Sequence, residues 1–382
     1  MDFDLNDEQR MLKDSVEKLL GARYDFDTRR RISDSPEGFD REIWSAFAEM
    51  GLLALPFSED DGGMGGGPVE TMIVMEAFGR ALVVEPFLAS VILAGGILRR
   101  AGSSGQRAEH IAAIAGGEKL YAFAHHERQA RYDLHDVATM ARADGEHYVI
   151  SGEKGLVLSG DSADRLIVSA RTSGNQRDEA GISLFLVDAK AEGVSRRGYA
   201  TQDGARGAEV TFDNVRVPAS ALIGTRDEAF PVIARVIEEA IAALCAESVG
   251  VMADMHEATI EYMKVRNQFG THIGSFQVLQ HAAADMFIAL EQARSMAMFA
   301  SMMVQEEDAR ERARAIAAAK VQIGNSCRFV GQNAVQLHGG VAVTMEYKVA
   351  HSFKRATMIE KLFGDTDHYT TRLADLGGVI GE

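Results

Sequence analysis

The chain has 382 residues, 46% of them apolar, which is enough for two or three domains with sizeable cores. Its formal net charge of −16 disfavours binding to nucleic acids or to anionic membranes. Only two cysteines occur, Cys245 and Cys327, and they lack metal-ligand spacing. We therefore expect a cytoplasmic protein without a disulfide framework or a metal site.

Residues 1–118 are predicted to form a helical domain. The first five residues lack the basic stretch of a signal peptide. Asn6 fits a helix N-cap, with Asp7 and Glu8 in the first turn. A second amphipathic segment surrounds Trp44. The apolar run 81–98 is interrupted by Glu85-Pro86 and Gly95-Gly96, which predicts a buried helix pair or a helix-turn rather than a membrane span.

Residues 119–226 are predicted to form a small β-barrel or sandwich. Asp144-Gly145 separates two β-rich segments, 137–143 and 147–150, which is a strong hairpin signal. Short β-rich runs follow, separated by turn residues, at 166–170, 182–187 and 210–212. The helical period is absent throughout this segment.

The helical period returns in residues 227–382. Four long segments are predicted to be helices, at 228–265, 276–305, 308–337 and 345–375. Long helices joined by short loops are typical of an antiparallel four-helix bundle. The predicted fold class is therefore mainly α with a central β domain.

Several motifs identify a family. Arg266-Asn-Gln-Phe-Gly270 ends the first bundle helix, and Gln336-Leu-His-Gly-Gly340 ends the third. With Gly152-Glu-Lys154 and the glycine-rich stretch after Trp44, they resemble the acyl-CoA dehydrogenase family over essentially the whole chain. Within it, the chain most resembles pimeloyl-CoA dehydrogenase small subunits, and residues 126–134 add to that likeness.

The resemblance implies an FAD-dependent dehydrogenation of an acyl-CoA thioester in fatty acid metabolism, with a dicarboxylyl-CoA such as pimeloyl-CoA as one possible substrate. It implies electron-transfer flavoprotein as the acceptor and a tetramer, either of this chain alone or with a larger homologous subunit. A base must remove the α-proton, and FAD accepts the hydride from the β-carbon. The implied cofactor-binding residues are Arg266, Gln268, Phe269, Gln336, Leu337, Gly339, Gly340, Thr366 and His368.

The flavin-ring segment departs from the family pattern. Where members have a Thr-Glu-Pro-Gly-Ala-Gly-Ser-Asp loop, residues 123–136 lack the glycines. Where many have Trp-Ile-Thr, the chain has Leu156-Val-Leu158, and leucine cannot supply a hydroxyl. His125 and His126 are alternative donors, although adjacent loop histidines are commonly just solvated.

The catalytic base also departs from the pattern. The family glutamate position is Gly364, and Asp365 follows it directly. Some members carry the base on the first bundle helix, at a position that falls on Ala240 here. Glu239 is one residue away, about 100° around the helix. Asp365 and Glu239 are therefore the candidate bases, although Glu238 and Glu239 also fit a solvated helix face.

The sequence is compatible with three hypotheses about function. The chain is an active dehydrogenase that uses Glu239 or Asp365, or a half-site subunit that donates FAD contacts to a larger homologous partner. The third and weaker one is a flavoenzyme with other chemistry, because an aspartate base occurs in relatives that oxidise nitroalkanes.

Overall fold

The computed structural model describes residues 5–378 and divides the chain into two compact units. Unit 1 contains Met1–Arg31, Pro68–Val83 and Ile241–Glu382, and unit 2 contains Ile32–Gly67 and Val84–Ala240. Helix α7 (Phe230–Val265) belongs to unit 2 up to Ala240 and to unit 1 from Ile241 onward.

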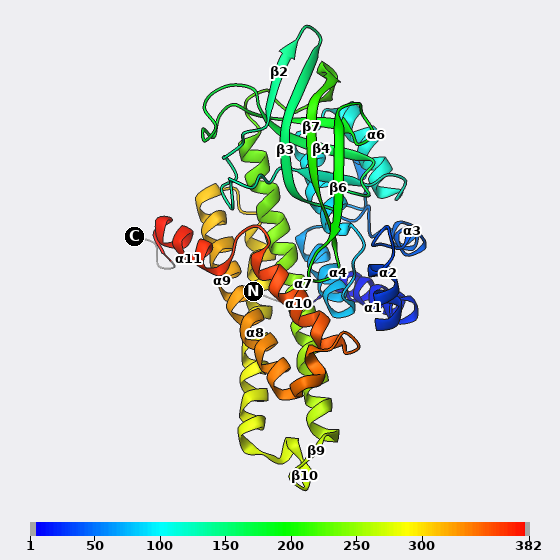
Figure 1. Ribbon diagram of the computed structural model, residues 1–382, viewed down its shortest axis with the longest axis vertical. Coiled ribbons are helices and arrows are strands. Elements are labelled where there is room, and N and C mark those ends of the chain that lie inside the picture. Colours follow the sequence, from blue (N-terminus) through cyan, green and yellow to red (C-terminus); the bar gives the residue numbers. More distant parts are fainter. Residues whose placement is uncertain (1–4, 379–382) are drawn as a thin grey trace. The chain divides into compact units, whose positions relative to one another are not determined.

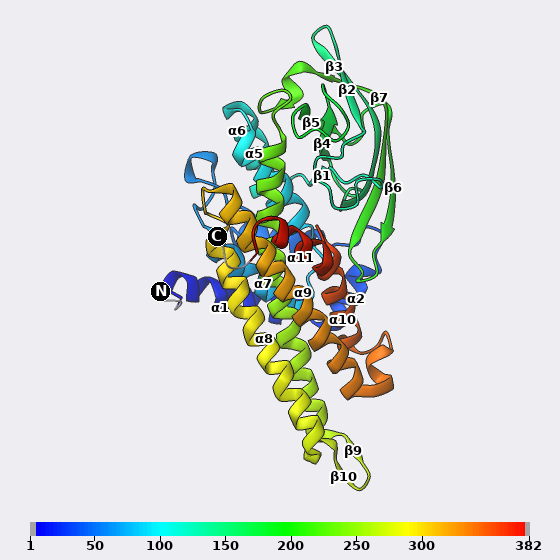
Figure 2. The ribbon, with the colours of Figure 1, turned by 90° about the vertical axis from the view of Figure 1, so that its left-hand side faces the viewer.

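Unit 1 is built on three long helices that run side by side, α7, α8 (Gln277–Met303) and α9 (Ala309–His338) (Figures 1 and 2). The shorter α10 (Lys348–Lys361) and α11 (Thr366–Asp375) pack on α9. Helices α1 (Asp7–Arg23) and α4 (Pro68–Ala81) belong to the same unit, as does most of α2 (Phe26–Ser33). The predicted C-terminal bundle is confirmed, and Asn6 caps α1 as expected, accepting from the Gln9 amide.

The predicted helix 345–375 is wrong in one respect, because it consists of two helices. Phe363 (φ +59°) and Gly364 (φ +125°) leave the helical region between α10 and α11. The Asp365 carboxylate then accepts a hydrogen bond from the His368 amide at 2.9 Å and starts α11 as its N-cap. The hydrophobic period runs through this break, so periodicity alone could not reveal it.

A buried ion pair joins α10 to α7 within unit 1. Arg355 donates from Nε and Nη2 to the two oxygens of Glu247, at 2.5 and 2.7 Å, and the Glu247 side chain is 4% exposed. Arg80 makes an equally bidentate pair with Glu257 at the surface, at 2.6 and 2.8 Å. The two pairs share geometry and differ in burial.

Arg355→Ala is expected to lower the free energy of unfolding by about 3–5 kcal/mol, because it leaves the Glu247 charge buried without its partner. Arg80→Ala is expected to cost about 1 kcal/mol or less, because water screens that pair. Urea unfolding of both variants at equal chain concentration checks the difference. Equal losses would show that burial does not decide the strength of these pairs.

The helices of unit 2 are α3 (Arg41–Glu49), α5 (Gly95–Ala101) and α6 (Ser104–Ala115), with a π-helix at Leu88–Ala94. The π-helix runs directly into α5. The predicted interruption of the helix at Gly95-Gly96 is therefore wrong. A Cβ on Gly95 would lie 2.5 Å from the Phe57 ring. Close packing, rather than chain reversal, therefore accounts for this glycine.

The middle of the chain forms one eight-stranded sheet. Its order is β6-β7-β3-β2-β4-β5-β8, and β1 pairs in parallel with β4. Asp144-Gly145 makes the predicted hairpin between β2 and β3, while β1, β6 and β8 were not predicted. The strands are β1 (Tyr121–Ala124), β2 (Met140–Asp144), β3 (His147–Leu158), β4 (Arg165–Arg171), β5 (Ile182–Asp188), β6 (Val194–Ala200), β7 (Arg206–Pro218) and β8 (Leu222–Ile223).

The sheet curves around a single core. Phe212 of β7 and Phe185 of β5 belong to the same buried cluster, although β3, β2 and β4 separate the two strands in the sheet. Strands this far apart in a flat sheet could not share one core, so the sheet bends over its inner face. The middle β domain predicted from the sequence is confirmed.

Candidate active site

The first family motif lies on an exposed hairpin between α7 and α8. Gln268 pairs with Thr271 in the short strands β9 (Asn267–Gln268) and β10 (Thr271–His272). Phe269 (φ +55°) and Gly270 (φ +80°) form the turn, and Phe269 is 92% exposed. Arg266, which begins this hairpin, is also exposed. A guanidinium and an aromatic ring are therefore held outward, where a ligand or another chain can reach them.

The second motif lies at the end of α9. Gln336 is exposed and Leu337 is buried, so only one of these neighbours faces outward. Gly339 has φ +67° and ψ −147°, a conformation that favours glycine. A Cβ on Gly339 or on Gly340 would meet nothing within 4 Å. This backbone is therefore open to close approach by a cofactor.

Thr366 and His368 lie at the start of α11. Thr366 is buried, and its amide and hydroxyl both donate to one oxygen of Glu360, at 3.2 and 3.1 Å. The Glu360 carboxyl is buried too; burial raises its pKa, but Lys361 and Thr366 outweigh this and hold the pKa below its usual value. The Thr366 hydroxyl donates its proton to Glu360 and can still accept a hydrogen bond.

Asp365 stands beside Gly364 in the same loop. Its Oδ1 accepts from the His368 amide, and its Oδ2 lies 3.3 Å from Lys361 Nζ. These bonds, the His368 amide first, hold the pKa of Asp365 below its usual value. A Cβ at Gly364 would lie 2.4 Å from Tyr369 Cε2. A side chain at Gly364 would therefore require the Tyr369 or His368 side chain to move.

Glu239, the other candidate base, is held by arginines in unit 2. Arg99 Nη2 donates to Oε2 at 2.8 Å, and Arg100 Nε donates to Oε1 at 2.9 Å. The Glu239 side chain is 13% exposed, and the Arg235 Nε lies 4.0 Å from Oε1. Both oxygens of Glu239 are thus already engaged by arginine side chains.

A buried polar cluster lies behind the altered flavin-ring segment. Lys154 uses all three ammonium protons: it donates to Glu127 Oε1 at 2.7 Å, to the His125 carbonyl at 3.1 Å and to Ser169 Oγ at 3.0 Å. Glu127 also accepts from the amides of Ala138 and Thr139. Burial lowers the pKa of Lys154 to about 8, against the opposing effect of Glu127. The sequence motif contained Lys154, but nothing in the sequence indicated Glu127 as its partner.

His125 belongs to this cluster and is neutral at physiological pH. Its Nδ1 shares a hydrogen bond with Ser169 Oγ at 2.9 Å, and its ring stacks on Phe123. Burial, together with the charge of Lys154, lowers the pKa of His125 to about 3. His125 is therefore buried, and the alternative of a solvated loop histidine is wrong for this residue.

Stability is expected to fall in acid because of His125. Its folded pKa lies below the unfolded value of about 6.5, so below that pH the unfolded chain takes up a proton that the folded chain does not. Between pH 7.5 and 5.5, this one group should cost about 1.4 kcal/mol of unfolding free energy. His125→Gln should remove that component in urea unfolding at the two pH values. The exposed His281→Gln should keep it, and identical pH dependence in wild type and His125→Gln would contradict the assignment.

The flavin-ring segment itself offers few donors. The His126 Nδ1 is bound to the Gly155 carbonyl at 3.2 Å. Leu156 has φ +46°, beside a register shift in the β3–β7 pairing. Leu158 presents no hydroxyl. Among Leu156, Val157 and Leu158, no side chain can therefore donate a hydrogen bond.

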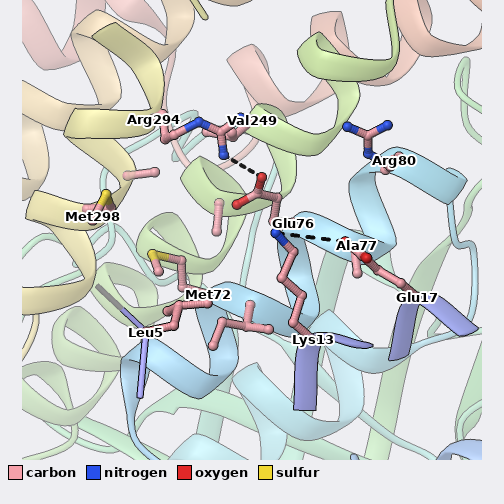
Figure 3. Close-up of a pocket in the computed structure, with 13 residues that line it drawn as sticks. Leu5, Lys13, Glu17, Met72, Glu76, Ala77, Arg80, Val249, Arg294 and Met298 are labelled. Atoms are coloured by element: carbon pink, nitrogen blue, oxygen red, sulfur yellow. Dashed lines mark hydrogen bonds and ion pairs between the residues drawn. The ribbon is translucent and has the colours of Figure 1, made fainter. Parts of the chain in front are cut away.

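Unit 1 also contains a cavity of about 320 Å³, between α1, α4, α7 and α8 (Figure 3). Figure 3 shows Glu76 beside Arg294, with Nη1 and Oε1 2.5 Å apart, and Lys13 beside Glu17. Arg80 is paired with Glu257. Each of the three cations on the wall thus has a carboxylate partner, so the cavity presents no surplus charge to a ligand. It contains none of the predicted site residues.

Among residues 5–378, no group of His, Cys, Asp or Glu is arranged to hold a metal ion. Within the same described part of the chain, no helix is long and apolar enough to span a membrane. Both cysteines are buried as free thiols, and burial raises the pKa of each to about 12.

Sequence comparison identifies the class. Residues 6–118, 122–215 and 230–375 match the N-terminal, middle and C-terminal domain models of acyl-CoA dehydrogenases. The chain belongs to the acyl-CoA dehydrogenase family, a family of FAD-containing oxidoreductases that act on acyl-CoA and are typically tetramers.

Two curated relatives cover nearly the whole chain. The probable acyl-CoA dehydrogenase YngJ of Bacillus subtilis is 29% identical, over 94% of this chain and 95% of the relative. The short-chain-specific acyl-CoA dehydrogenase of Clostridium acetobutylicum is 28% identical, over 96% and 97%. The comparisons single out neither a pimeloyl-CoA dehydrogenase small subunit nor a dicarboxylyl-CoA substrate, and they do not favour a non-catalytic half-site role.

Solved structures show the same fold. A chain of the ChsE4–ChsE5 complex from Mycobacterium tuberculosis has a TM-score of 0.88 and 26% identity, with 98% of both chains covered. The FAD complex of PigA has a TM-score of 0.89 and 25% identity, also with 98% of both chains covered. One similar protein is thus part of a complex of two named chains, and another binds FAD.

Proposed function

We propose that this chain, with bound FAD, catalyses the α,β-dehydrogenation of an acyl-CoA thioester and passes the electrons to an electron-transfer flavoprotein. The observation that carries this proposal is the outward presentation of the two motifs of unit 1. Arg266 and Phe269 project from one hairpin, and Gly339 and Gly340 leave open space beside their backbone. A buried structural role would require neither feature.

FAD would supply the hydride acceptor, and the protein must supply the base, the position and the electrostatics. Arg266 and Gln268 are the groups that we propose for the phosphate-bearing part of FAD, with Gly339 and Gly340 giving backbone access. Asp365 is our proposed base, in preference to Glu239. Glu239 is bound at both oxygens by arginines, whereas Asp365 Oδ2 has one side-chain contact, to Lys361 Nζ at 3.3 Å.

Visible spectroscopy tests the function directly. The purified chain, reconstituted with FAD, should show bound flavin that bleaches when a suitable acyl-CoA is added. The panel should run from butyryl-CoA to palmitoyl-CoA and include pimeloyl-CoA, because a dicarboxylyl-CoA is one of the substrates that we propose. Arg266→Ala and Phe269→Ala serve as variants, and Arg310→Ala, exposed at the start of α9, is the control. A chain that retains flavin but is bleached by none of these thioesters would contradict the proposed dehydrogenation.

A second function is favoured by two observations, the crowded position at Gly364 and the missing hydroxyl at Leu158. It is a half-site subunit that donates the Arg266 and Gly339–Gly340 contacts to a larger homologous partner. Co-expression with such a subunit separates the two proposals. Flavin and activity that appear only in the mixed complex would support the half-site function, and bleaching by the chain alone would exclude it.

A further inference from the structure

One aromatic cluster in unit 1 lies behind both motifs. The His338 ring, at the end of α9, is 4.6 Å from the Tyr262 ring of α7 and 5.2 Å from the Tyr347 ring at the N-cap of α10. These are distances at which aromatic pairs attract. His338 is 3% exposed, so the imidazole is a buried link between three helix ends.

The charge state of His338 suits a packing role. Its Nδ1 is 2.8 Å from the Ala334 carbonyl. Burial lowers the pKa of His338, and this outweighs the carbonyls of Ala334 and Ala258, which favour the protonated ring. The ring is therefore neutral at physiological pH and interacts with the two tyrosines through its faces.

The cluster connects directly to the proposed cofactor contacts. The Tyr262 carbonyl accepts from the Arg266 amide at 2.9 Å, where α7 ends and the hairpin begins. On α9, His338 stands between Gln336 and Gly339. Through these contacts the His338 ring links the end of α7, where the Arg266 hairpin begins, to the end of α9, where Gly339 follows.

We propose that His338 is a positioning residue, which holds the end of α7 and the end of α9 in the fixed relation that the FAD contacts require. The cofactor part of this inference rests on the proposed function. The clamp itself, His338 between Tyr262 and Tyr347, is a property of the cofactor-free chain. The family motif contributes the backbone and the glycines, and the imidazole adds the coupling between two motifs that lie about 70 residues apart in the sequence.

Hydrogen exchange of the cofactor-free chain tests the clamp. His338→Ala should accelerate amide exchange in 262–272 and 339–347 by about tenfold, because it removes two aromatic contacts. His338→Phe retains both ring contacts and loses only the polar contacts of the imidazole nitrogens, so it should exchange at close to the wild-type rate. The exposed His281→Ala, on α8, is the control. Equal acceleration in the Ala and Phe variants, or none in either, would overturn the clamp.

FAD titration by flavin fluorescence tests the consequence. The dissociation constant should rise about tenfold in His338→Ala and be restored in His338→Phe. Tyr347→Leu breaks the clamp from the other side and should repeat both effects, even where His338→Ala fails to fold. Accelerated exchange with unchanged FAD affinity would refute the link to the cofactor. A wild-type chain that binds no FAD would refute the proposed function, while the exchange data would still decide the clamp.

Discussion

Gly250→Ala is expected to destabilise unit 1 by about 3 kcal/mol or more, the largest loss of stability that we predict for one added methyl group. A Cβ at Gly250, in α7, would lie 1.9 Å from the Glu76 carbonyl oxygen and 2.7 Å from the Arg80 amide nitrogen, both backbone atoms of α4. Backbone cannot rotate away as a side chain can, so the two helices would have to separate. Separation would also loosen the packing of the buried residues around the crossing.

Gly79 occupies the reciprocal place on α4. A Cβ there would lie 1.9 Å from the Glu247 carbonyl oxygen of α7. The two glycines thus allow one close helix crossing, and Gly79→Ala should be similarly damaging. The double variant should cost less than the sum of the single variants, because the first methyl group already separates the helices.

Gly21→Ala provides the control, since Gly21 is also helical and a Cβ there would meet nothing within 4 Å. It should be neutral or stabilise the chain by about 0.5–1 kcal/mol, the usual helix advantage of alanine. Urea unfolding at one fixed chain concentration measures all four variants. A Gly250→Ala chain as stable as Gly21→Ala would mean that the helices are not in contact at this crossing.

Most elements of this fold could be predicted from the sequence, because a long segment with a regular apolar period indicates one type of element. The helices near 228–265, 276–305 and 308–337 were found within a few residues, as was the Asp144-Gly145 hairpin. The break at Gly364 was missed because the apolar period continues across it. Strand β6 was missed because its register comes from pairing with β7, and pairing partners are not visible in a local pattern.

The candidate site was predicted less completely, for a related reason. Motif residues such as Arg266 and Gly339 can be recognised from a short stretch of sequence, and the structure places them on exposed turns. The role of Glu239 depends on Arg99 and Arg100, which are about 140 residues away in the sequence, so its ion pairs could not be read from its own helix. The same holds for the Glu127–Lys154 pair.

Asp365→Asn is expected to lower kcat for acyl-CoA oxidation by about 100-fold or more if Asp365 is the base, the usual scale of general base catalysis. Stability should hardly change, because asparagine caps a helix N-terminus about as well as aspartate and can still accept from the His368 amide. Asp365→Ala should lose the same activity and about 1 kcal/mol of stability as well. Asp308→Asn, at the matching N-cap of α9, is the control.

The pH profile gives an independent measurement. The His368 amide and Lys361 hold the pKa of Asp365 below its usual value, so the carboxylate stays ionised throughout the neutral and mildly acidic range. The rate should therefore not fall through protonation of this group between pH 8 and 5. Full activity of Asp365→Asn would exclude this base. Glu239→Gln would then test the other candidate, and an unchanged rate in that variant would exclude Glu239 as well.

A glutamate at Gly364, where the family resemblance predicts the base, should not rescue the Asp365→Asn enzyme. At Gly364 the φ of +125° is itself unfavourable for a side chain, and the added Cβ would meet Tyr369 at 2.4 Å and His368 at 2.8 Å. Tyr369 is fixed by its hydroxyl, which donates to the Phe363 carbonyl at 2.9 Å. Gly364→Glu should therefore cost as much stability as Gly364→Ala and restore no turnover. Recovery of activity in the Gly364→Glu/Asp365→Asn double variant would mean that this loop can open around Tyr369, and that the aspartate is a substitute for the glutamate rather than the only base the fold can hold.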